Sequence, residues 1–409
     1  MRIFLLTSAA LLLLGACGGK ETPKMDNGTI IEVSTEGNLA ENLQIALIMA
    51  EAGSTVAIPA GTYKFIDGLS LDVEGVTLRG AGEGETILDF SGQTGSGEGL
   101  LVTSANVTLS DFTIRDTTGD GIKSKGADGI IYKDLTVEWT GEPDAGNGAY
   151  GVYPVSSKNV LVDGVTVRGA SDAGIYVGQS ENIIVRNSLA EYNVAGIEIE
   201  NSSYADVYGN TAQHNAGGVL IFDLPDLPVI GGHSTRVFDN DIKNNNTHNF
   251  APPGNIVATV PSGTGVIIMA NENVHVFGNR FAGNKTVQVI VGAYQDSFTD
   301  ENYNPLPRNI VVRDNSYAGG GEDPQGILSE FAALMGGTLP PVVWDGVSSW
   351  GGGAAIEVNL TVKEDADIGY LNLGLISYPV VEKNITPSPF RPKSTPKPEP
   401  APVKLPQDG

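Results

Sequence analysis

The chain repeats itself at a spacing of about 23 residues, and this period limits the folds that it can adopt. Each repeat contains a short run rich in Val and Ile that leads into a turn residue. The aligned turn residues, separated by 23, 30, 23, 23, 30, 39 and 36 positions, are Asp111, Asp134, Gly164, Asn187, Asn210, Asn240, Asn279 and Asn315. A fixed period with insertions predicts a solenoid in which each repeat forms one coil. Because β-branched runs dominate over leucine or helical templates, the coils are expected to be all β.

A second strand in each repeat begins with glycine followed by an apolar residue. The pairs are Gly121-Ile122, Gly151-Val152, Gly174-Ile175, Gly196-Ile197, Gly218-Val219, Gly265-Val266 and Gly326-Ile327. Side chains alternate along a strand, so the apolar residue should enter the core and the next residue should face outward. One outward file is then Lys123, Tyr153, Tyr176, Glu198, Leu220 and Ile267, and the next is Lys125, Val155, Gly178, Glu200, Phe222 and Met269.

Asparagine is the residue that best suits the corners of such a solenoid. It tolerates the left-handed backbone conformation, and its amide can bond to the same residue in the coils above and below. We therefore expect Asn187, Asn210 and Asn240 to occupy equivalent corners of successive coils.

The segment before the coils predicts an amphipathic helix that covers the open first coil. Asn38 suits an N-cap, and apolar residues follow at helical spacing as Leu39, Leu43, Ala46, Leu47 and Ala50. The order of helix, "GSTVAIPAGTY" and coils resembles the right-handed parallel β-helix proteins of the pectin-lyase-like superfamily. Residues 106–316 also resemble an uncharacterised family of bacterial parallel β-helix repeat lipoproteins. The resemblance implies an all-β right-handed parallel β-helix over residues 38–350 and leaves the chemistry open, since this superfamily includes lyases, hydrolases, epimerases, adhesive spikes and scaffolds.

The two ends of the chain carry different signals. Residues 1–17 read as a secretion signal, and "LLGAC" resembles the lipoprotein box, which implies export, a lipid on Cys17 and, with Gly18, sorting to the outer membrane. A linker is expected over 18–37 and a capping strand segment over 351–385. Residues 386–409 include 8 prolines, which predicts a disordered, extended and unpacked tail.

Charge and cysteine content restrict the partners. The 48 acidic residues outnumber the 24 basic ones, which disfavours binding to nucleic acid and to polyanions that no cation bridges. Cys17 is the only cysteine, so stability must come from core burial and backbone hydrogen bonds rather than disulfides.

The candidate site lies on the outward files. Tyrosines can stack on sugar rings, and carboxylates can hold a cation or act as acid and base. The predicted ligand-binding residues are Lys125, Tyr153, Tyr176, Glu198, Glu200, Phe222 and Asp223, the catalytic candidates are Lys123, Tyr176, Glu198 and Glu200, and the candidate ligands for calcium are Glu198, Glu200 and Asp223. Insertions at 223–236, 244–265 and 292–307 are expected to build walls beside this face. The spacings of His214, His233 and His248 do not predict a zinc site.

The leading hypothesis is an outer-membrane-anchored β-helix that binds an extracellular or envelope polysaccharide, with processing of that polysaccharide as its extension. One alternative is a non-catalytic scaffold that docks an envelope protein. Another is a calcium-assisted polysaccharide lyase or epimerase, for which Lys123, Lys125, Tyr153, Arg168 and Tyr176 are suitable residue types. Against an enzyme, the Asp-Pro-His-Asp motif of mannuronan epimerases is absent, and the paired aspartates of polygalacturonase-type hydrolases are not recognisable.

Overall fold

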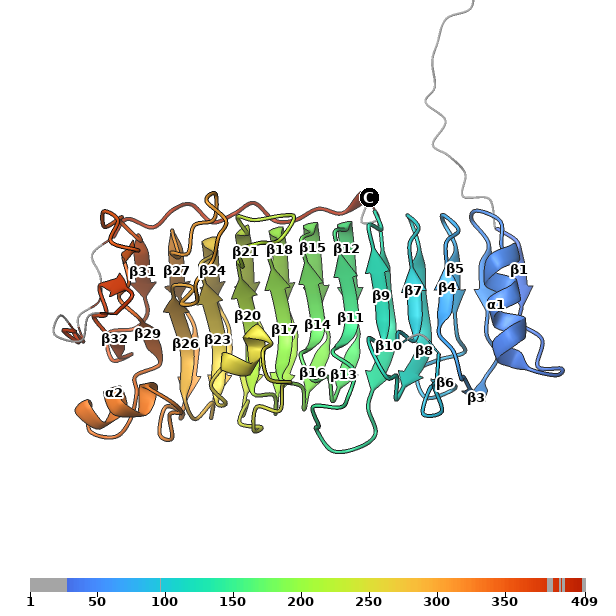
Figure 1. Ribbon diagram of the computed structural model, residues 1–409, viewed down its shortest axis with the longest axis horizontal. Helices are drawn as coiled ribbons and strands as arrows, with labels where there is room; N and C mark the ends of the chain where they lie inside the picture. Colours follow the sequence, from blue (N-terminus) through green and yellow to red (C-terminus); the bar gives the residue numbers. More distant parts are fainter. Residues whose placement is uncertain (1–27, 96, 381–384, 390, 392–393, 407–409) are drawn as a thin grey trace, which may run out of the picture.

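Every pairing between named strands is parallel, and each strand pairs with its counterpart one coil away. The computed structural model describes residues 28–95, 97–380, 385–389, 391 and 394–406, and the coils stack into an elongated rod (Figure 1). This confirms the predicted all-β parallel solenoid.

Two large sheets form the walls of the rod. Sheet A contains β1 (Ile30–Glu32), β2 (Thr55–Ala57), β3 (Gly61–Lys64), β5 (Thr77–Arg79), β6 (Thr86–Asp89), β8 (Thr108–Arg115), β10 (Ile131–Glu138), β12 (Lys158–Asp163), β13 (Thr166–Arg168), β15 (Glu181–Arg186), β16 (Leu189–Glu191), β18 (Ser203–Tyr208), β19 (Thr211–Gln213), β21 (His233–Phe238), β22 (Asp241–Lys243), β24 (Glu272–Phe277), β25 (Arg280–Ala282), β27 (Ile310–Arg313), β28 (Ser316–Ala318) and β31 (Leu360–Lys363). Sheet B contains β4 (Leu69–Leu71), β7 (Leu100–Val102), β9 (Ile122–Lys125), β11 (Tyr150–Val155), β14 (Ala173–Gly178), β17 (Ala195–Glu200), β20 (Gly217–Phe222), β23 (Thr264–Met269), β26 (Val287–Gly292), β29 (Val342–Trp344) and β32 (Tyr370–Asn372).

A central coil shows how the sequence forms one turn of the rod. The six-residue strand β15 and the three-residue strand β16 belong to sheet A and meet at a corner, and β17 of sheet B closes the coil. The inward residues of all three strands are Val, Ile and Ala with exposed fractions near zero. Because these residues recur in every coil, they stack into one continuous hydrophobic core.

The register of sheet B matches the prediction over six coils. Ile175 pairs with Ile197, Ile197 with Val219, and Val219 with Val266, so the predicted outward files also align. The exception is Gly326-Ile327, because Ile327 is 61% exposed and precedes helix α2 (Leu328–Leu334). In the coil after Gly265-Val266, the equivalent positions are occupied by Gln288-Val289. A glycine before an apolar residue also suits a turn into a helix, which is why the marker failed there.

Asparagine ladders join the coils at two corners. The first contains Asn210, Asn240, Asn279 and Asn315. The side-chain amide of Asn210 donates to Asn240 Oδ1 at 3.0 Å and to the carbonyl of Val185 at 2.9 Å, and it is 1% exposed. A second ladder of Asn193, Asn215, Asn245 and Asn284 lies at the other end of the short strands. Sequence reasoning missed it, although the fixed spacing of Asn210 to Asn215 and of Asn240 to Asn245 was a usable signal.

Asn187 was assigned to the wrong position by one residue. Arg186 is in register with Tyr208, so Asn187 aligns with Gly209, is exposed and has a φ of +52°. Ser188 takes the place in the ladder, and its backbone N–H donates to Asn210 Oδ1 at 3.0 Å. The error arose because the coil from Glu181 to Ser203 has 22 residues, whereas the preceding coil has 23. The similar triplets that end at Asn187 and Asn210 therefore do not align in space.

The N-terminal cap is a helix, as predicted. Helix α1 (Leu39–Met49) begins after Asn38, whose side chain accepts the backbone N–H of Ala40 at 3.1 Å, and it packs Leu43 and Leu47 on the first coil. The predicted linker is partly structured, since β1 lies within it and pairs with β2. The signal segment and Cys17 lie outside the described residues. No helix in the described part of the chain has the length and hydrophobicity needed to cross a membrane.

The C-terminal end differs from the prediction. Strands β31 and β32 continue the two sheets beyond residue 350, and β30 (Ser349–Trp350) pairs with β33 (Ser377–Tyr378). The proline-rich tail is extended but not unpacked: its described residues 394–406 run back along the outside of the rod (Figure 1). Leu405 is only 3% exposed, so the prediction of a disordered, unpacked tail is wrong for this segment. Proline content fixes the extended backbone but does not prevent the residues between the prolines from packing.

The corrected register gives a stability test with a matched control. Asn210→Ala leaves the buried backbone N–H of Ser188 and the carbonyl of Val185 without this partner. We expect the free energy of unfolding to fall by about 1–3 kcal/mol, the usual cost of an unsatisfied buried group. Equilibrium chemical denaturation measures it. Asn187→Gly should change little, because glycine accepts the positive φ and the site is exposed, and equal losses in both variants would contradict the assigned ladder.

Candidate functional site

The predicted outward residues on sheet B point outward, but most of them are covered. Tyr176 is 4% exposed, Glu198 1% and Phe222 2%. The insertion between β22 and β23 folds over this face and packs Val257 and Val260 against it, with a short 3-10 helix, η1 (Ile256–Thr259). The expectation of an exposed patch is therefore wrong: strand alternation sets the direction of a side chain but not what lies above it.

Three tyrosine rings gather at the edge of the covered region. Tyr150 lies 4.4 Å from Tyr153 and 4.7 Å from Tyr176 between ring centroids, and Tyr153 lies 4.9 Å from Tyr176 with its ring nearly perpendicular. Tyr150 and Tyr153 are half-buried, so this tyrosine cluster presents part of its aromatic surface to solvent. Sequence reasoning identified Tyr153 and Tyr176 but missed Tyr150, which is the first residue of β11, the strand that also carries Tyr153.

Three carboxyl groups lie beneath and beside these rings, and we call Asp172, Glu198 and Glu200 the acid cluster. Burial and the mutual repulsion of these groups raise the pKa of Asp172 to about 7, and burial raises the pKa of Glu200 to about 7. Tyr176 Oη donates to Glu200 Oε1 at 2.6 Å, and Asn255 from the insertion donates to Asp172 Oδ2 at 3.0 Å. The group therefore holds protons at a pH where ordinary carboxyl groups are ionised.

Glu198 is the most isolated member of the acid cluster. Neither of its carboxyl oxygens has a hydrogen-bond partner within the described residues. Burial, then repulsion from Glu200 and Asp172, raises its pKa well above the ordinary value, which favours the neutral form. A neutral carboxyl is the form that costs least to bury without a partner.

Lys123 lies at the exposed rim of the tyrosine cluster. Its ammonium group is 4.7 Å from the Tyr153 ring centroid, 3.3 Å from Asp120 Oδ2 and 3.7 Å from Glu98 Oε1. Lys125, two residues further along the same strand, is exposed. The basic candidates therefore line the rim, whereas the acidic candidates lie beneath the insertion.

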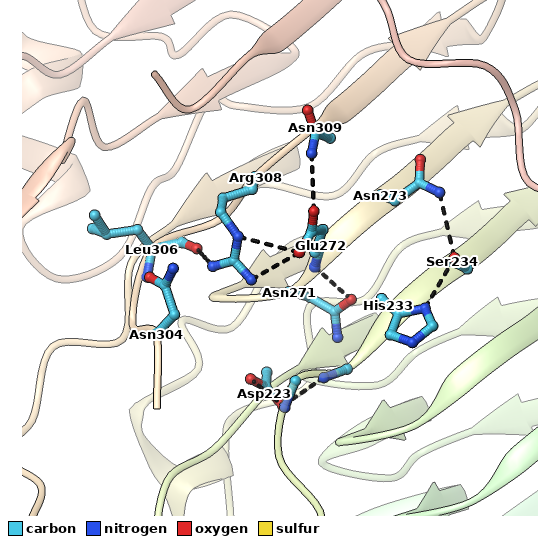
Figure 2. A network of polar contacts seen from close by, with 12 residues as sticks. Asp223, His233, Ser234, Asn271, Glu272, Asn273, Asn304, Leu306, Arg308 and Asn309 are labelled. Carbon is cyan, nitrogen blue, oxygen red and sulfur yellow. Dashed lines mark hydrogen bonds and ion pairs between the residues drawn. The ribbon is translucent and has the colours of Figure 1, made fainter. Parts of the chain in front are cut away.

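Asp223 is a loop anchor beside the acid cluster, and its charge also raises the pKa of Glu200. Its carboxylate accepts the backbone N–H of Gly231 at 2.9 Å and of Gly232 at 2.8 Å, as Figure 2 shows. The insertion at 292–307 ends next to Arg308, whose guanidinium group donates to Glu272 Oε2 at 3.0 Å (Figure 2). Asp223 thus closes the insertion that follows β20.

No group of three or more His, Cys, Asp or Glu side chains is arranged to hold a metal ion in the part of the chain that the structure describes. The predicted calcium ligands Glu198, Glu200 and Asp223 accordingly do not form a metal centre in this arrangement.

A pocket of about 480 Å³ lies at a corner of the rod, where β10 and β13 end. It is lined by residues 138–143, Arg168, Gly169 and Tyr192, and we call it the corner pocket. Tyr192 is 42% exposed and stacks on His214 at 5.3 Å. Arg168 is paired with Glu191. Sequence reasoning missed this pocket, although the 30-residue gap between Asp134 and Gly164 marked the insertion that forms it.

The corner pocket and the acid cluster are connected by short chain segments. Gly169 lines the pocket, and Asp172 follows three residues later, a distance of at most about 10 Å at extended spacing. On the neighbouring coil, the loop from Trp139 leads into Tyr150. One elongated ligand could therefore contact the pocket and the tyrosine cluster together.

A family model described as "Right handed beta helix region" matches residues 98–248. The chain has a parallel β-helix fold, and residues 98–248 match its right-handed form. Among solved structures, this β-helix is similar to the A-module of mannuronan C-5 epimerase AlgE4 from Azotobacter vinelandii, with 15% identity, a TM-score of 0.52, and coverage of 80% of this chain and 91% of that one. It is also similar to the Agl-KA catalytic domain, with 14% identity, a TM-score of 0.52, and coverage of 84% and 54%. At these identities the likeness shows the fold. No curated protein matches this β-helix by sequence.

The raised pKa values predict how the stability depends on pH. Because the folded pKa of Glu200 is about 7 against an ordinary 4.5, the folded state holds this proton more tightly. That contribution is fully present below about pH 4.5 and is lost as the pH rises through 7. Glu200→Gln, which mimics the protonated form, should reduce the fall in melting temperature between pH 5 and 8. Glu181→Gln, at a half-exposed carboxyl outside the cluster, is the control, and an unchanged pH profile in Glu200→Gln would contradict the assignment.

Proposed function

We propose that this β-helix binds an uncharged polysaccharide across the corner pocket and the tyrosine cluster. The observations that carry the proposal are the exposed Tyr192 in the corner pocket and the loop that leads from Trp139 of that pocket into Tyr150 of the tyrosine cluster. Aromatic faces stack on the C–H faces of sugar rings, and side-chain polar groups at their edges bond the hydroxyls.

Charge narrows the class of glycan. The chain carries a net charge of −24, and the carboxyl groups of Asp120 and Glu98 lie beside Lys123 at the rim of the tyrosine cluster. Two basic groups of this region, Arg168 and Lys123, are already engaged by Glu191 and by Asp120 with Glu98, whereas Lys125 is exposed. A polyanionic chain would be repelled, so an uncharged polysaccharide fits best.

Processing of the bound glycan is a second candidate function, and the acid cluster favours it. A carboxyl group with a pKa of about 7 can donate a proton at neutral pH and accept it back, as general acid–base catalysis requires. Asp172 is the member closest along the chain to the corner pocket. The tyrosines and the amide of Asn255 would orient it, and the surrounding insertion would limit access of water.

The structurally similar proteins support the hypothesis that a bound glycan is processed, without specifying a reaction. One of them is named as a mannuronan C-5 epimerase, and the other as a catalytic domain. The fold is thus compatible with polysaccharide chemistry, but the residues in this chain must carry the function. The scaffold alternative, in which the rod docks an envelope protein, predicts no glycan binding.

A matched pair of tyrosines tests the binding site. Tyr192 lines the corner pocket, whereas Tyr204 lies on sheet A; both are exposed, both contact a histidine ring, and their φ values are +59° and +57°. Tyr192→Ala should weaken retention on a glycan array by about tenfold, the value of one lost stacking contact, and Tyr204→Ala should not.

Reducing-end and absorbance assays on the retained glycan show whether it is also cleaved. Equal effects of the two tyrosine substitutions would contradict the assigned site. A wild-type protein that retains no glycan would favour the scaffold.

We also propose that Cys17 carries a lipid that anchors the rod to the outer membrane. The support is the sequence "LLGAC" and the absence of any other cysteine in the chain.

Cys17→Ser should release the protein from the membrane fraction into the soluble fraction after cell fractionation, because the thiol that would carry the lipid is removed. Wild-type sedimentation of this variant would contradict the anchor.

A further inference from the structure

The described tail segment, residues 394–406, lies on sheet A and contacts residues outside both the corner pocket and the acid cluster. It runs back along the rod (Figure 1) and follows one file of outward residues that the strand register aligns. The aligned file is Thr361, Val311, His275, Arg236, Asp206, Ile184 and Leu161. We call this surface the tail groove.

The two ends of the tail segment are attached differently. At the first end, Ser394 Oγ lies 2.7 Å from Thr361 Oγ1 and donates to the carbonyl of Leu360 at 2.5 Å. At the far end, Leu405 is 3% exposed and packs in an apolar socket formed by Leu161 and Ile184. The segment is therefore fixed at both ends rather than at one chance contact.

A charged clasp holds the middle of the tail segment. The Glu399 carboxylate pairs with Arg236 at 2.8 Å and with Arg313 at 2.6 Å. Arg236 is in turn held by Asp206 through two bonds of 2.8 and 2.5 Å, and Asp206 accepts the backbone N–H of Val403 at 3.0 Å. Bidentate arginine–carboxylate pairs of this kind are strong and directional.

Aromatic side chains position the two arginines. Tyr208, Phe238 and Phe277 stack along the next file at 4.9 and 5.1 Å. The Arg236 guanidinium lies 4.8 Å from the Phe238 centroid, and that of Arg313 lies 4.1 Å from the Phe277 centroid. The coil-by-coil stacking thus presents two preformed guanidinium donors for one carboxylate.

The length of the tail segment fits the groove. A polyproline II chain rises about 3.1 Å per residue, so the path from Ser394 to Leu405 spans about 34 Å. Six coil steps of about 4.8 Å span about 29 Å. The prolines that separate the contacting residues also lower the entropy lost on binding.

We propose that the tail groove is a binding site for an extended, proline-rich peptide that carries a carboxylate and, six residues later, a leucine. This chain's own tail is its resident ligand, bound in cis. The site is independent of the proposed glycan function, because its residues lie on sheet A outside both the corner pocket and the acid cluster.

The test uses the full-length protein with the tail disabled in place by Glu399→Gln and Leu405→Asp. Circular dichroism confirms that this variant is folded. Trypsin should cleave after Lys404 much faster in it than in wild type, because Leu405 no longer occupies its socket. Equally fast cleavage in wild type would overturn the proposal, since the tail would then not be bound.

A labelled peptide of residues 394–406 is then titrated against both proteins. It should bind the disabled variant at least tenfold more tightly than wild type, whose groove is occupied. Adding Arg313→Gln to the disabled variant should weaken binding about tenfold, and adding Arg280→Gln should not, because Arg280 is an exposed arginine that pairs with Asp241 on another strand. Failure of the folded variant to bind the peptide would overturn the proposal, and a wild-type dimer in light scattering would overturn the cis assignment.

Repeating the titration at pH 5 adds a readout specific to the groove. His275 is 2% exposed beneath the tail, facing Arg236, Arg313 and Glu399, and burial lowers its pKa to about 4. A free groove would let this histidine take up a proton near its ordinary pKa of about 6.5, so acidification from pH 7 to 5 should weaken peptide binding by up to about twentyfold. His275→Leu should flatten this dependence, and an unchanged pH profile in that variant would contradict the placement of His275 under the bound peptide.

Discussion

Hydrogen bonding between each residue and its counterpart one coil away is the constraint on which the whole molecule depends. It fixes the strand spacing and aligns equivalent positions of successive coils into files. Side chains in one file are therefore close enough to form amide ladders, aromatic stacks and ion pairs. The asparagine ladders, the Tyr208–Phe238–Phe277 stack and the tyrosine cluster are products of the same register. A side chain in this fold therefore acts as a member of a file, and its neighbours in space lie about 23 residues away in sequence.

Insertions provide what the repeating coil cannot. The regular coil exposes a flat wall, whereas the loop from Trp139 forms the corner pocket and the segment around η1 covers the acid cluster. Covering these carboxyl groups removes them from water, which raises their pKa values, while the half-buried tyrosines keep one edge accessible. The corner pocket and the acid cluster thus lie where the period is interrupted, and the uninterrupted coils supply rigidity.

Much of the fold could be predicted from the sequence because the same residue types recur at equivalent positions of each coil. The files that contain Tyr153, Tyr176, Glu198 and Glu200 were predicted in register, since alternation and glycine markers are local properties. Their burial was not predictable in this way, because it depends on a loop that is distant in the chain. Asn187 shows that a marker residue cannot reveal a coil one residue shorter than its neighbours. The tail shows that proline content determines backbone extension but not whether a complementary surface exists.

The first asparagine ladder also has a direction. Each amide donates toward the next coil, and the last one, Asn315, donates to the carboxyl group of Glu364, through its side chain at 2.8 Å and its backbone N–H at 3.0 Å. The carboxyl group of Glu364 accepts both bonds but has no amide group with which to donate to a further coil. The ladder therefore ends at Glu364. During evolution, duplicated coils could be inserted upstream of Glu364 without disturbing this end. A coil added beyond it would need a new terminator, so the rod can lengthen from within but not from this tip.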